Sequence, residues 1–283
     1  MPTRVAPIGA HVSVSGGLSR ALREAETIGA EVVQIFVANP RGWAPPAADP
    51  RADQQFAADC TERRLPVFVH APYLINFGSP TVATLTKSAA ALRFSLQRAA
   101  AVGASGVVMH AGSAVQGNRW DDAMAQVRGS VLEVLDAVPD APPLLIEPTA
   151  GGGGALASDA ASLGAYLDVL GRDERVGVCL DTCHVHAAGH DLSTPASAAK
   201  ALREYGRAAG RGRIGLIHAN DSRDPVGSKR DRHEAIGRGT IGLPAFATVL
   251  TAPATRGVPL VVETSDADHT DDIAALKVLR DAG

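Results

Sequence analysis

The chain of 283 residues contains few cysteines, no long apolar run and no excess of positive charge. Its 3 cysteines are too few for a disulfide scaffold and suit a reducing compartment. No apolar stretch approaches the roughly 20 residues that cross a bilayer, and the first ten residues lack the core of a signal peptide. We therefore expect a cytoplasmic protein that does not associate with membranes.

The balance of charge excludes a polybasic protein. Lys and Arg together number 27 and Asp and Glu number 30, so the formal net charge is −3. A polybasic protein that binds nucleic acid through bulk charge would be strongly positive. The chain is 46% hydrophobic and 20% charged, which is typical of a globular protein. Its length fits one α/β barrel of about 250 residues, so we expect a monomer with a single domain over residues 1–283 and a core over about 6–282.

Short apolar, β-branched runs alternate with Ala- and Leu-rich stretches of helical length. The expected strands cover residues 8–12, 31–37, 67–70, 107–110, 144–147, 176–181, 214–218 and 260–263. The expected helices cover residues 18–28, 81–102, 121–138, 158–170, 194–209, 244–250 and 271–280. Strands separated by helices indicate a parallel sheet, and eight such units favour an α/β fold of the (β/α)8 TIM-barrel type. A doubly wound open sheet is the alternative.

Six consecutive expected strands end in a residue that can bind a divalent metal. These residues are His70, His110, Glu147, Asp181, His218 and Glu263. At the C-terminal mouth of a barrel the six side chains would converge. Imidazole nitrogens and carboxylate oxygens suit zinc, manganese or iron better than they suit metals that seek thiolates. The pattern therefore predicts a metal site at the C-terminal face.

Two shorter clusters extend this set to nine candidates. Asp181 and His184 lie three residues apart at the end of one strand, and Asp231 and His233 lie two apart in a long loop over residues 220–242. Zinc usually takes four ligands, so nine exceed the needs of one ion and suit two or three ions that share a carboxylate. Each histidine alone would more often be a hydrogen-bonded core residue, and it is the complete set that predicts a multinuclear site.

Other residues near this set are expected to have structural roles. We expect His186 to be a neighbour of the ligands and not a ligand. Cys179 and Cys183 are expected to be small buried residues, because no second cysteine pair completes a zinc finger. His269 lies in an acidic stretch and is expected at a solvated helix entry. The glycines at residues 151–154 are expected to form a flexible turn, or else to bring the backbone close to a ligand.

Eight segments carry specific motifs in unbroken order along the chain. They read IGAHVSVSGG (8–17), NPRGW (39–43), HAPYLIN (70–76), HAGS (110–113), EPTAG (147–151), CLDTCH (179–184), HANDS (218–222) and GSKRDRHE (227–234). With these motifs the sequence resembles the endonuclease IV family, the zinc-dependent apurinic/apyrimidinic endonucleases. The resemblance extends over residues 8–263 and implies the barrel fold expected above.

All nine candidates fall on metal positions of that family. The resemblance implies three zinc ions per chain, with manganese possible at one position because its ligand preferences overlap. It assigns His70, His110 and a bridging Glu147 to the first ion, Glu147, Asp181, His218 and Glu263 to the second, and His184, Asp231 and His233 to the third.

The resemblance also implies a substrate and a reaction. The substrate is duplex DNA with abasic sites, as in base excision repair. A zinc-activated hydroxide would hydrolyse the phosphodiester 5′ to the lesion and leave a 3′-hydroxyl and a 5′-deoxyribose phosphate. Glu147 and Glu263 would bridge the metals or orient the water. The expected DNA contacts are Arg41 and Tyr73 from the family loops, Arg230 and Arg232 from their charge, and Trp43 as a further candidate wedge.

The sequence departs from the family pattern beside the ligands and not at them. Pro148 follows the bridging glutamate where the family usually has Asn, and Ala111 replaces a usual Pro. His186 and His190 stand at aromatic positions, and Arg238 stands where an acidic residue is common. Because no ligand is lost, the departures bear on the rate of the reaction and not on its type.

Two other functions compete with this interpretation. A sugar isomerase or epimerase on a similar barrel would use only Glu147, Asp181, His218 and Glu263, around one ion. The other five candidates discriminate against it, because a one-metal enzyme has no use for two more sets of ligands. A non-catalytic protein that binds metal or DNA lesions is expected to have lost at least one ligand, and none is lost.

Overall fold

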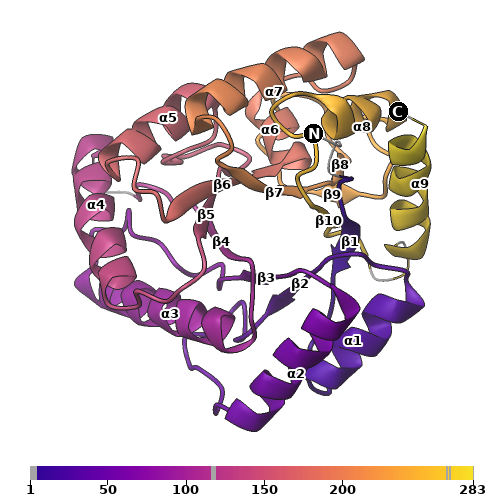
Figure 1. Ribbon diagram of the computed structural model, residues 1–283. Coiled ribbons are helices and arrows are strands. Elements are labelled where there is room, and N and C mark those ends of the chain that lie inside the picture. Colours follow the sequence, from indigo (N-terminus) through magenta and orange to yellow (C-terminus); the bar gives the residue numbers. More distant parts are fainter. Residues whose placement is uncertain (1–4, 116–118, 266, 268, 283) are drawn as a thin grey trace.

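The computed structural model describes residues 5–115, 119–265, 267 and 269–282. Eight parallel strands close into a barrel in the order β1-β10-β7-β6-β5-β4-β3-β2 (Figure 1). They are β1 (Ile8–His11), β2 (Val33–Phe36), β3 (Val67–His70), β4 (Gly106–His110), β5 (Leu144–Glu147), β6 (Val176–Asp181), β7 (Ile214–His218) and β10 (Leu260–Val262). Closure confirms the TIM barrel and excludes the doubly wound sheet, which would have two open edges.

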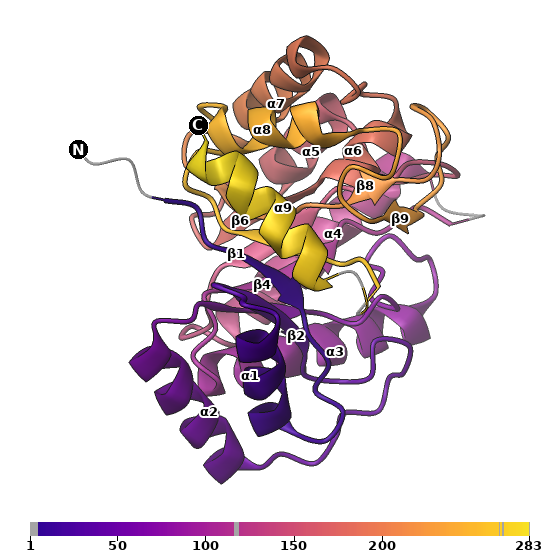
Figure 2. The same ribbon diagram turned by 90° about the vertical axis from the view of Figure 1, so that its right-hand side faces the viewer.

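Helices form a ring around the strands (Figures 1 and 2). They are α1 (Leu18–Thr27), α2 (Pro50–Arg63), α3 (Val82–Ala101), α4 (Trp120–Asp136), α5 (Ala160–Val169), α7 (Pro195–Ala209), α8 (Leu243–Thr251) and α9 (His269–Asp281), and the short α6 (Thr182–Ala188) follows β6 directly. Polar side chains cap four of the described helices, α2, α5, α6 and α7; in α5 Asp159 accepts from Ser162 N at 2.7 Å, and in α7 Thr194 accepts from Ser197 N at 3.1 Å. None of the described helices combines the length and the apolarity needed to cross a bilayer.

The helix α2 is absent from the elements expected above. It buries only Asp53, Phe56 and Cys60, so its apolar period is weak. Its start nevertheless carries a usable signal, because Asp49 accepts a hydrogen bond from Ala52 N at 3.0 Å and a proline occupies the first turn. Capping chemistry, and not periodicity, marks this helix in the sequence.

Side chains inside the barrel form a cluster of their own. It consists of Val32, Phe68, Val108, Leu145, Cys179, Leu216 and Val261. Successive side chains of a strand point to opposite faces of the sheet. The residue two positions after each member of this cluster therefore also points into the barrel. For six strands that residue is His70, His110, Glu147, Asp181, His218 and Glu263. The strand pleat therefore points all six strand-end candidates into the C-terminal mouth of the barrel, next to the apolar interior.

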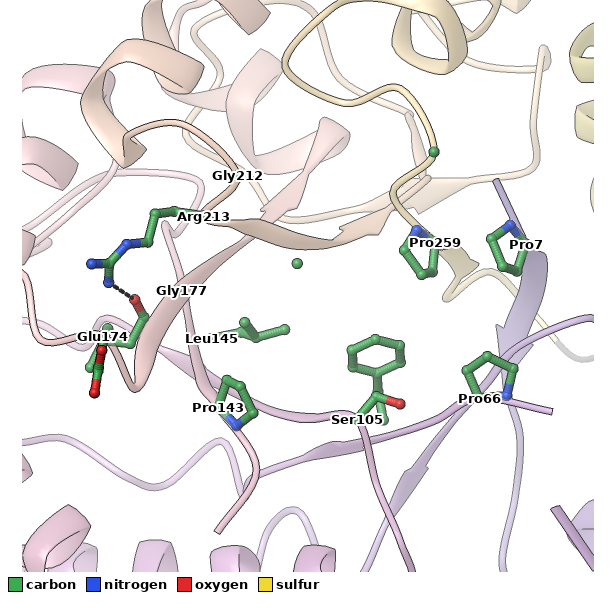
Figure 3. Close-up of a pocket in the computed structure, with 14 residues that line it drawn as sticks. Pro7, Pro66, Ser105, Pro143, Leu145, Glu174, Gly177, Gly212, Arg213 and Pro259 are labelled. Atoms are coloured by element: carbon green, nitrogen blue, oxygen red, sulfur yellow. Dashed lines mark hydrogen bonds between the residues drawn. The ribbon is translucent and has the colours of Figure 1, made fainter. Parts of the chain in front are cut away.

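At the N-terminal end of the barrel a proline precedes four of the strands. Pro7, Pro66, Pro143 and Pro259 stand immediately before β1, β3, β5 and β10 and line a cavity of about 370 Å³ (Figure 3). Proline has no N–H with which to donate a hydrogen bond to a neighbouring strand, but its carbonyl can still accept one. The carbonyl of Pro66 accepts a hydrogen bond from Val33 N at 3.0 Å. The candidate ligands lie at the other end of the strands.

The long loop over residues 220–242 is held by one buried carboxylate. It contains the antiparallel pair β8 (Asp221–Ser222) and β9 (His233–Glu234). The carboxylate of Asp221 accepts hydrogen bonds at 2.8–3.1 Å from the backbone N–H groups of Ser222, Gly237, Ile241 and Gly242. These bonds fold the loop back on itself and fix the segment that carries two candidate ligands.

His269 differs from its expected solvated position. It begins α9, is 1% exposed, and its Nε2 lies 3.2 Å from the carbonyl of Thr264. The carbonyl gives one ring nitrogen of the buried imidazole a hydrogen-bond partner. The acidic composition of the stretch was therefore a wrong guide to exposure, since Asp272 is also buried and accepts a hydrogen bond from Ile236 N at 2.8 Å.

Candidate metal centre

The nine predicted ligands meet at the C-terminal mouth of the barrel. Six come from the strand ends, His184 comes from α6, and Asp231 and His233 come from the 220–242 loop. In Figure 2 the strands β8 and β9, which belong to that loop, lie at the side of the molecule opposite the start of β1. The loop therefore closes over the same end at which the strands finish.

The ligand atoms of these residues form three compact groups, each with all atoms within 4.8 Å of one another. The groups are His70, His110 and Glu147; Glu147, Asp181, His218 and Glu263; and His184, Asp231 and His233. They coincide with the three sets that the family resemblance implies. Glu147 belongs to two groups, so its carboxylate is the natural bridge between two ions.

Cys183 joins a fourth group with Asp181 and His233. Its thiol is buried, and burial raises its pKa. A thiol that stays protonated is a poor metal ligand, because the thiolate is the form that binds. The structure therefore agrees with the expected role of Cys183 as a small buried residue, although it lies beside the cluster.

The carboxylate of Glu147 is fully buried and faces four imidazoles. Its Oε1 lies 3.0 Å from His218 Nδ1 and 3.3 Å from His184 Nδ1. Its Oε2 lies 3.3 Å from the Nε2 atoms of His70 and His110. A buried carboxylate needs such partners, since an unpaired charge in the interior is very costly.

Hydrogen bonds at the outer edge of the cluster orient the histidine rings. The outer Nδ1 donates to a backbone carbonyl from His70 to Ala71 at 2.7 Å, from His184 to Pro148 at 3.0 Å and from His233 to Glu263 at 3.2 Å. A carbonyl oxygen has no proton to give, so the ring nitrogen must be the donor. Each ring therefore turns its Nε2 toward the cluster, as metal-binding histidines do.

Two of the inward nitrogens have no hydrogen bond. The Nε2 atoms of His184 and His233 are buried and make none with any described residue. They lie 3.2 Å and 3.0 Å from oxygens of Asp231, yet not in hydrogen-bonding geometry. A buried polar atom without a hydrogen bond lowers the free energy of unfolding by about 1–3 kcal/mol. A cation bound between His184, Asp231 and His233 would satisfy both nitrogens and the carboxylate. The donor set thus fits a divalent metal.

Oppositely charged neighbours in the cluster shift the pKa values of its members against the effect of burial. Burial alone would raise the pKa of Glu147, but His218 and His110 hold it well below its ordinary value. Burial alone would lower the pKa of His233, but Asp181 and Asp231 raise it to about 9. His233 is therefore held as a cation beside Asp181 and Asp231 at neutral pH, and a metal ion that binds to His233 must displace this proton.

Comparison with known proteins identifies the relatives of this chain. The family of xylose isomerase-like TIM barrels matches residues 22–282. The probable endonuclease 4 of Streptomyces avermitilis is 51% identical over 280 residues, which cover 97% of this chain and 90% of that protein. The chain belongs to the endonuclease IV family.

Two further members of the endonuclease IV family extend this relationship. The probable endonuclease 4 of Streptomyces coelicolor is 50% identical over 280 residues, which cover 97% of this chain and 95% of that protein. The crystal structure of endonuclease IV from Thermus thermophilus has a TM-score of 0.86 at 30% identity and covers 98% of this chain and 100% of its own. Membership confirms the resemblance on which the sequence expectations rested.

Two departures from the endonuclease IV pattern have clear places in the structure. Pro148 accepts the hydrogen bond of His184 through its backbone carbonyl, so the loss of the usual Asn side chain leaves this contact intact. His186 is buried, accepts a hydrogen bond from Leu192 N at 3.2 Å and lies 3.3 Å from the hydroxyl of Thr240. His186 is therefore a structural neighbour of the ligands, as expected.

Gln34 is a member of the site that the sequence interpretation missed. It is fully buried, and its Nε2 donates to Glu263 Oε1 at 2.7 Å. Its Oε1 accepts from His218 Nε2 at 2.9 Å, which turns the Nδ1 of His218 toward the cluster. His11 lies beside it, with Nδ1 at 3.0 Å from Gln34 Nε2. Gln34 follows the interior residue Val32 by two positions, so the inward alternation of β2 was the available signal.

Replacing Gln34 by leucine is expected to weaken metal retention and activity by about 10–100-fold, because His218 and Glu263 lose the group that orients them. Bound metal per chain after dialysis and the nicking rate measure this effect. Gln126→Leu is the matched control, since Gln126 also makes two hydrogen bonds, to the carbonyls of Phe77 and Ser79, but touches no ligand. Equal metal loss in both variants would show that Gln34 acts only on stability.

Of the predicted DNA contacts, Tyr73 lies at the rim of the cluster. Tyr73 is 45% exposed, and its ring stacks on that of His110 with centroids 5.5 Å apart. Its backbone N–H donates to the carbonyl of Pro40 at 3.0 Å, next to the exposed Arg41. The loops after β2 and β3 therefore meet at Tyr73 and Pro40, so Tyr73 lies against a metal candidate and the neighbouring Arg41 is exposed.

The arginines of the 220–242 loop are already paired. The guanidinium of Arg232 donates to both carboxylate oxygens of Asp224, at 2.7 and 2.5 Å. Arg230 lies 3.6 Å from the same carboxylate. Arg232 thus braces the turn that carries Asp231 and His233, while Arg230 is exposed and its guanidinium has, among the residues that the structure describes, only this distant partner. DNA contact by either residue stays a prediction.

Proposed function

We propose that this protein is a zinc-dependent DNA repair endonuclease, acting as a monomer in the cytoplasm. It would hydrolyse the phosphodiester 5′ to abasic sites in duplex DNA and leave a 3′-hydroxyl and a 5′-deoxyribose phosphate. The observation that carries the proposal is the complete set of nine ligands in three groups around one bridging carboxylate. Its relatives named probable endonuclease 4 support the nuclease assignment.

The charge of the mouth suits a phosphate substrate. Three zinc ions would bring a charge of +6, and the four carboxylates Glu147, Asp181, Asp231 and Glu263 bring −4, so the loaded mouth would carry +2. The net charge of −3 of the chain would become +3. A protein that is formally acidic can therefore attract DNA at its metal site.

The chain's own residues have distinct tasks in this proposal. Bound zinc would supply Lewis-acid neutralisation of the phosphate and activation of water. Glu147 would be shared by two ions, Glu263 would help to hold one of them and to orient the water, and Gln34 would keep His218 and Glu263 in their orientations. Tyr73 offers an aromatic face at the rim against which an extruded abasic nucleotide could pack, and Arg41 would bind the backbone.

A one-metal sugar isomerase or epimerase is the alternative function. It would need only the group of Glu147, Asp181, His218 and Glu263. Nothing in that reaction explains the group of His184, Asp231 and His233, whose buried nitrogens converge without hydrogen bonds. The nine-ligand arrangement therefore favours the nuclease.

A mapped nicking assay tests the proposed function. The substrate is an end-labelled duplex with one tetrahydrofuran abasic analogue, and the same duplex without the lesion is the control. We expect a single cut immediately 5′ to the analogue and a product that a DNA polymerase can extend, which requires a 3′-hydroxyl. Failure of folded, metal-replete protein to cut, or equal cutting of the intact duplex, would refute the proposal. Epimerisation of ketose sugars would then be assayed.

Metal affinity is expected to rise with pH up to about pH 9. The pKa of His233 is raised to about 9, so its imidazole is protonated at pH 7 and must lose the proton before it can bind a metal. Affinity should gain about tenfold per pH unit for each proton released and should level off above that pKa. Zinc titration calorimetry in buffers of different ionisation enthalpy counts the protons. Zinc binding without proton release at pH 7 would contradict the pairing described here.

A further inference from the structure

Besides the candidate metal centre, the structure has a distinctive groove outside the barrel, between α7 and α8. There the structure has a groove of about 990 Å³ at the C-terminal ends of the two helices and along the segment that follows α8. The two helices lie side by side in Figures 1 and 2. Their C-terminal ends lead into β7 and β10, so the groove opens toward the N-terminal end of the barrel. DNA bound at the metal centre would lie at the opposite end.

The groove is strongly basic in a chain of negative net charge. Arg203, Arg207, Arg211 and Arg256 line it, and no Asp or Glu is among the residues that do. All four are exposed, and the guanidinium groups of the first three make no ion pair or hydrogen bond with any residue that the structure describes. The guanidinium of Arg256 donates to the carbonyl of Thr251 at 3.1 Å, which holds it at the rim. Four cations without a carboxylate partner fit an anionic ligand.

The lower part of the groove is apolar. It is lined by Ala199, Ile214, Ala252, Ala254 and Val258. Gly206 brings the two walls together, because a Cβ at this position would lie 2.6 Å from the Cβ of Ala254. A pocket of this size, with an apolar floor and a few charged groups at the edge, is typical of sites that bind a ligand or a peptide side chain.

We propose that this groove binds an acidic peptide segment of a partner protein. Its carboxylates would pair with the arginines, and an apolar side chain between them would cover the floor. Arg203 and Arg207 are four residues apart on α7, which is about 6 Å, and alternate side chains of an extended peptide are about 6.6 Å apart. A DNA duplex would lay its phosphates on the same arginines but would leave the apolar floor uncovered, so the combination favours the peptide.

The test uses three fluorescent peptides and the full, metal-loaded chain. The first peptide alternates three Asp with Leu and Phe, the second has Asn for each Asp, and the third has Ser for Leu and Phe. Fluorescence anisotropy should give binding of the first that is at least about tenfold tighter than that of either control. Arg203→Glu with Arg207→Glu should abolish this binding. Arg23→Glu with Arg93→Glu, which changes the net charge equally at exposed positions of α1 and α3, should leave it unchanged.

Each other outcome overturns the proposal. Binding of the first peptide that survives the double substitution in α7 would assign the peptide to another surface. Equal binding of the first and third peptides, with displacement by an undamaged DNA duplex, would make the groove a general polyanion site and favour nucleic acid. Absence of binding by all three peptides to the folded protein would leave the arginines without an acidic partner. Nicking of abasic DNA by the α7 variant verifies its fold and separates this result from the nuclease proposal.

Discussion

Replacing Glu147 by glutamine is expected to lower the rate of abasic-site cleavage by at least about a thousandfold. The carboxylate is the only one shared by two of the three ligand groups, and both of its oxygens face imidazole nitrogens. An amide keeps one acceptor oxygen, but its nitrogen can only donate, and a nitrogen that donates cannot bind a metal. One of the two groups must therefore lose a ligand. Nicking rates and bound metal per chain measure the effect.

The matched control for this substitution is Glu174→Gln. Glu174 is exposed and lies at the N-terminal end of the barrel, so the same chemical change there should leave cleavage unaltered. Circular dichroism verifies that both variants fold. A Glu147→Gln protein that cuts abasic DNA within about tenfold of the original rate would remove the bridging carboxylate from the mechanism.

Removal of the metals is expected to lower the melting temperature by about 10 °C. A ligand at a thousand times its dissociation constant adds about 4 kcal/mol to the free energy of unfolding, and for a domain of this size each kcal/mol is worth about 2–4 °C. The ligands come from six strands, from α6 and from the 220–242 loop, so the ions would join segments that are distant in the chain. Calorimetry before and after chelation gives the shift.

A variant limited to the third group separates binding from unrelated effects of the chelator. Asp231→Asn should reduce the metal content by one ion and should lower the melting temperature by only part of the full shift. The chelator should then cause a smaller further loss in this variant than in the unaltered protein. An unchanged melting temperature in protein that has demonstrably lost its metal would contradict the predicted contribution to stability.

The convergence of the strand-end candidates was predictable because strand periodicity is a strict geometric rule. Side chains two positions apart share a face, and barrel closure brings equivalent positions to one mouth. The same rule finds Gln34, whose amide joins Glu263 to His218, but an amide does not stand out in a search for metal ligands. His269 was misplaced for the converse reason, since composition says little about which face of a helix is buried.

The loop-borne members of the site depended on tertiary contacts that sequence patterns do not contain. Lys229 N donates to the carbonyl of Ala187 at 2.9 Å, and Asp221 collects four backbone N–H groups. These bonds decide where Asp231 and His233 point. In the absence of the structure only the family resemblance grouped them with His184. The groove between α7 and α8 was likewise invisible, because its arginines come from two separate segments of the chain.

The most direct test of the metal centre is a zinc titration of chelator-stripped protein, in which bound zinc and cleavage of the abasic duplex are followed together. We predict that about three equivalents bind and that cutting 5′ to the lesion, absent from the stripped protein, returns as the site fills. Saturation at one equivalent, with no cleavage at any zinc concentration, would contradict the nine-ligand centre and its proposed reaction. It would leave the four-ligand group of Glu147, Asp181, His218 and Glu263 as the functional site.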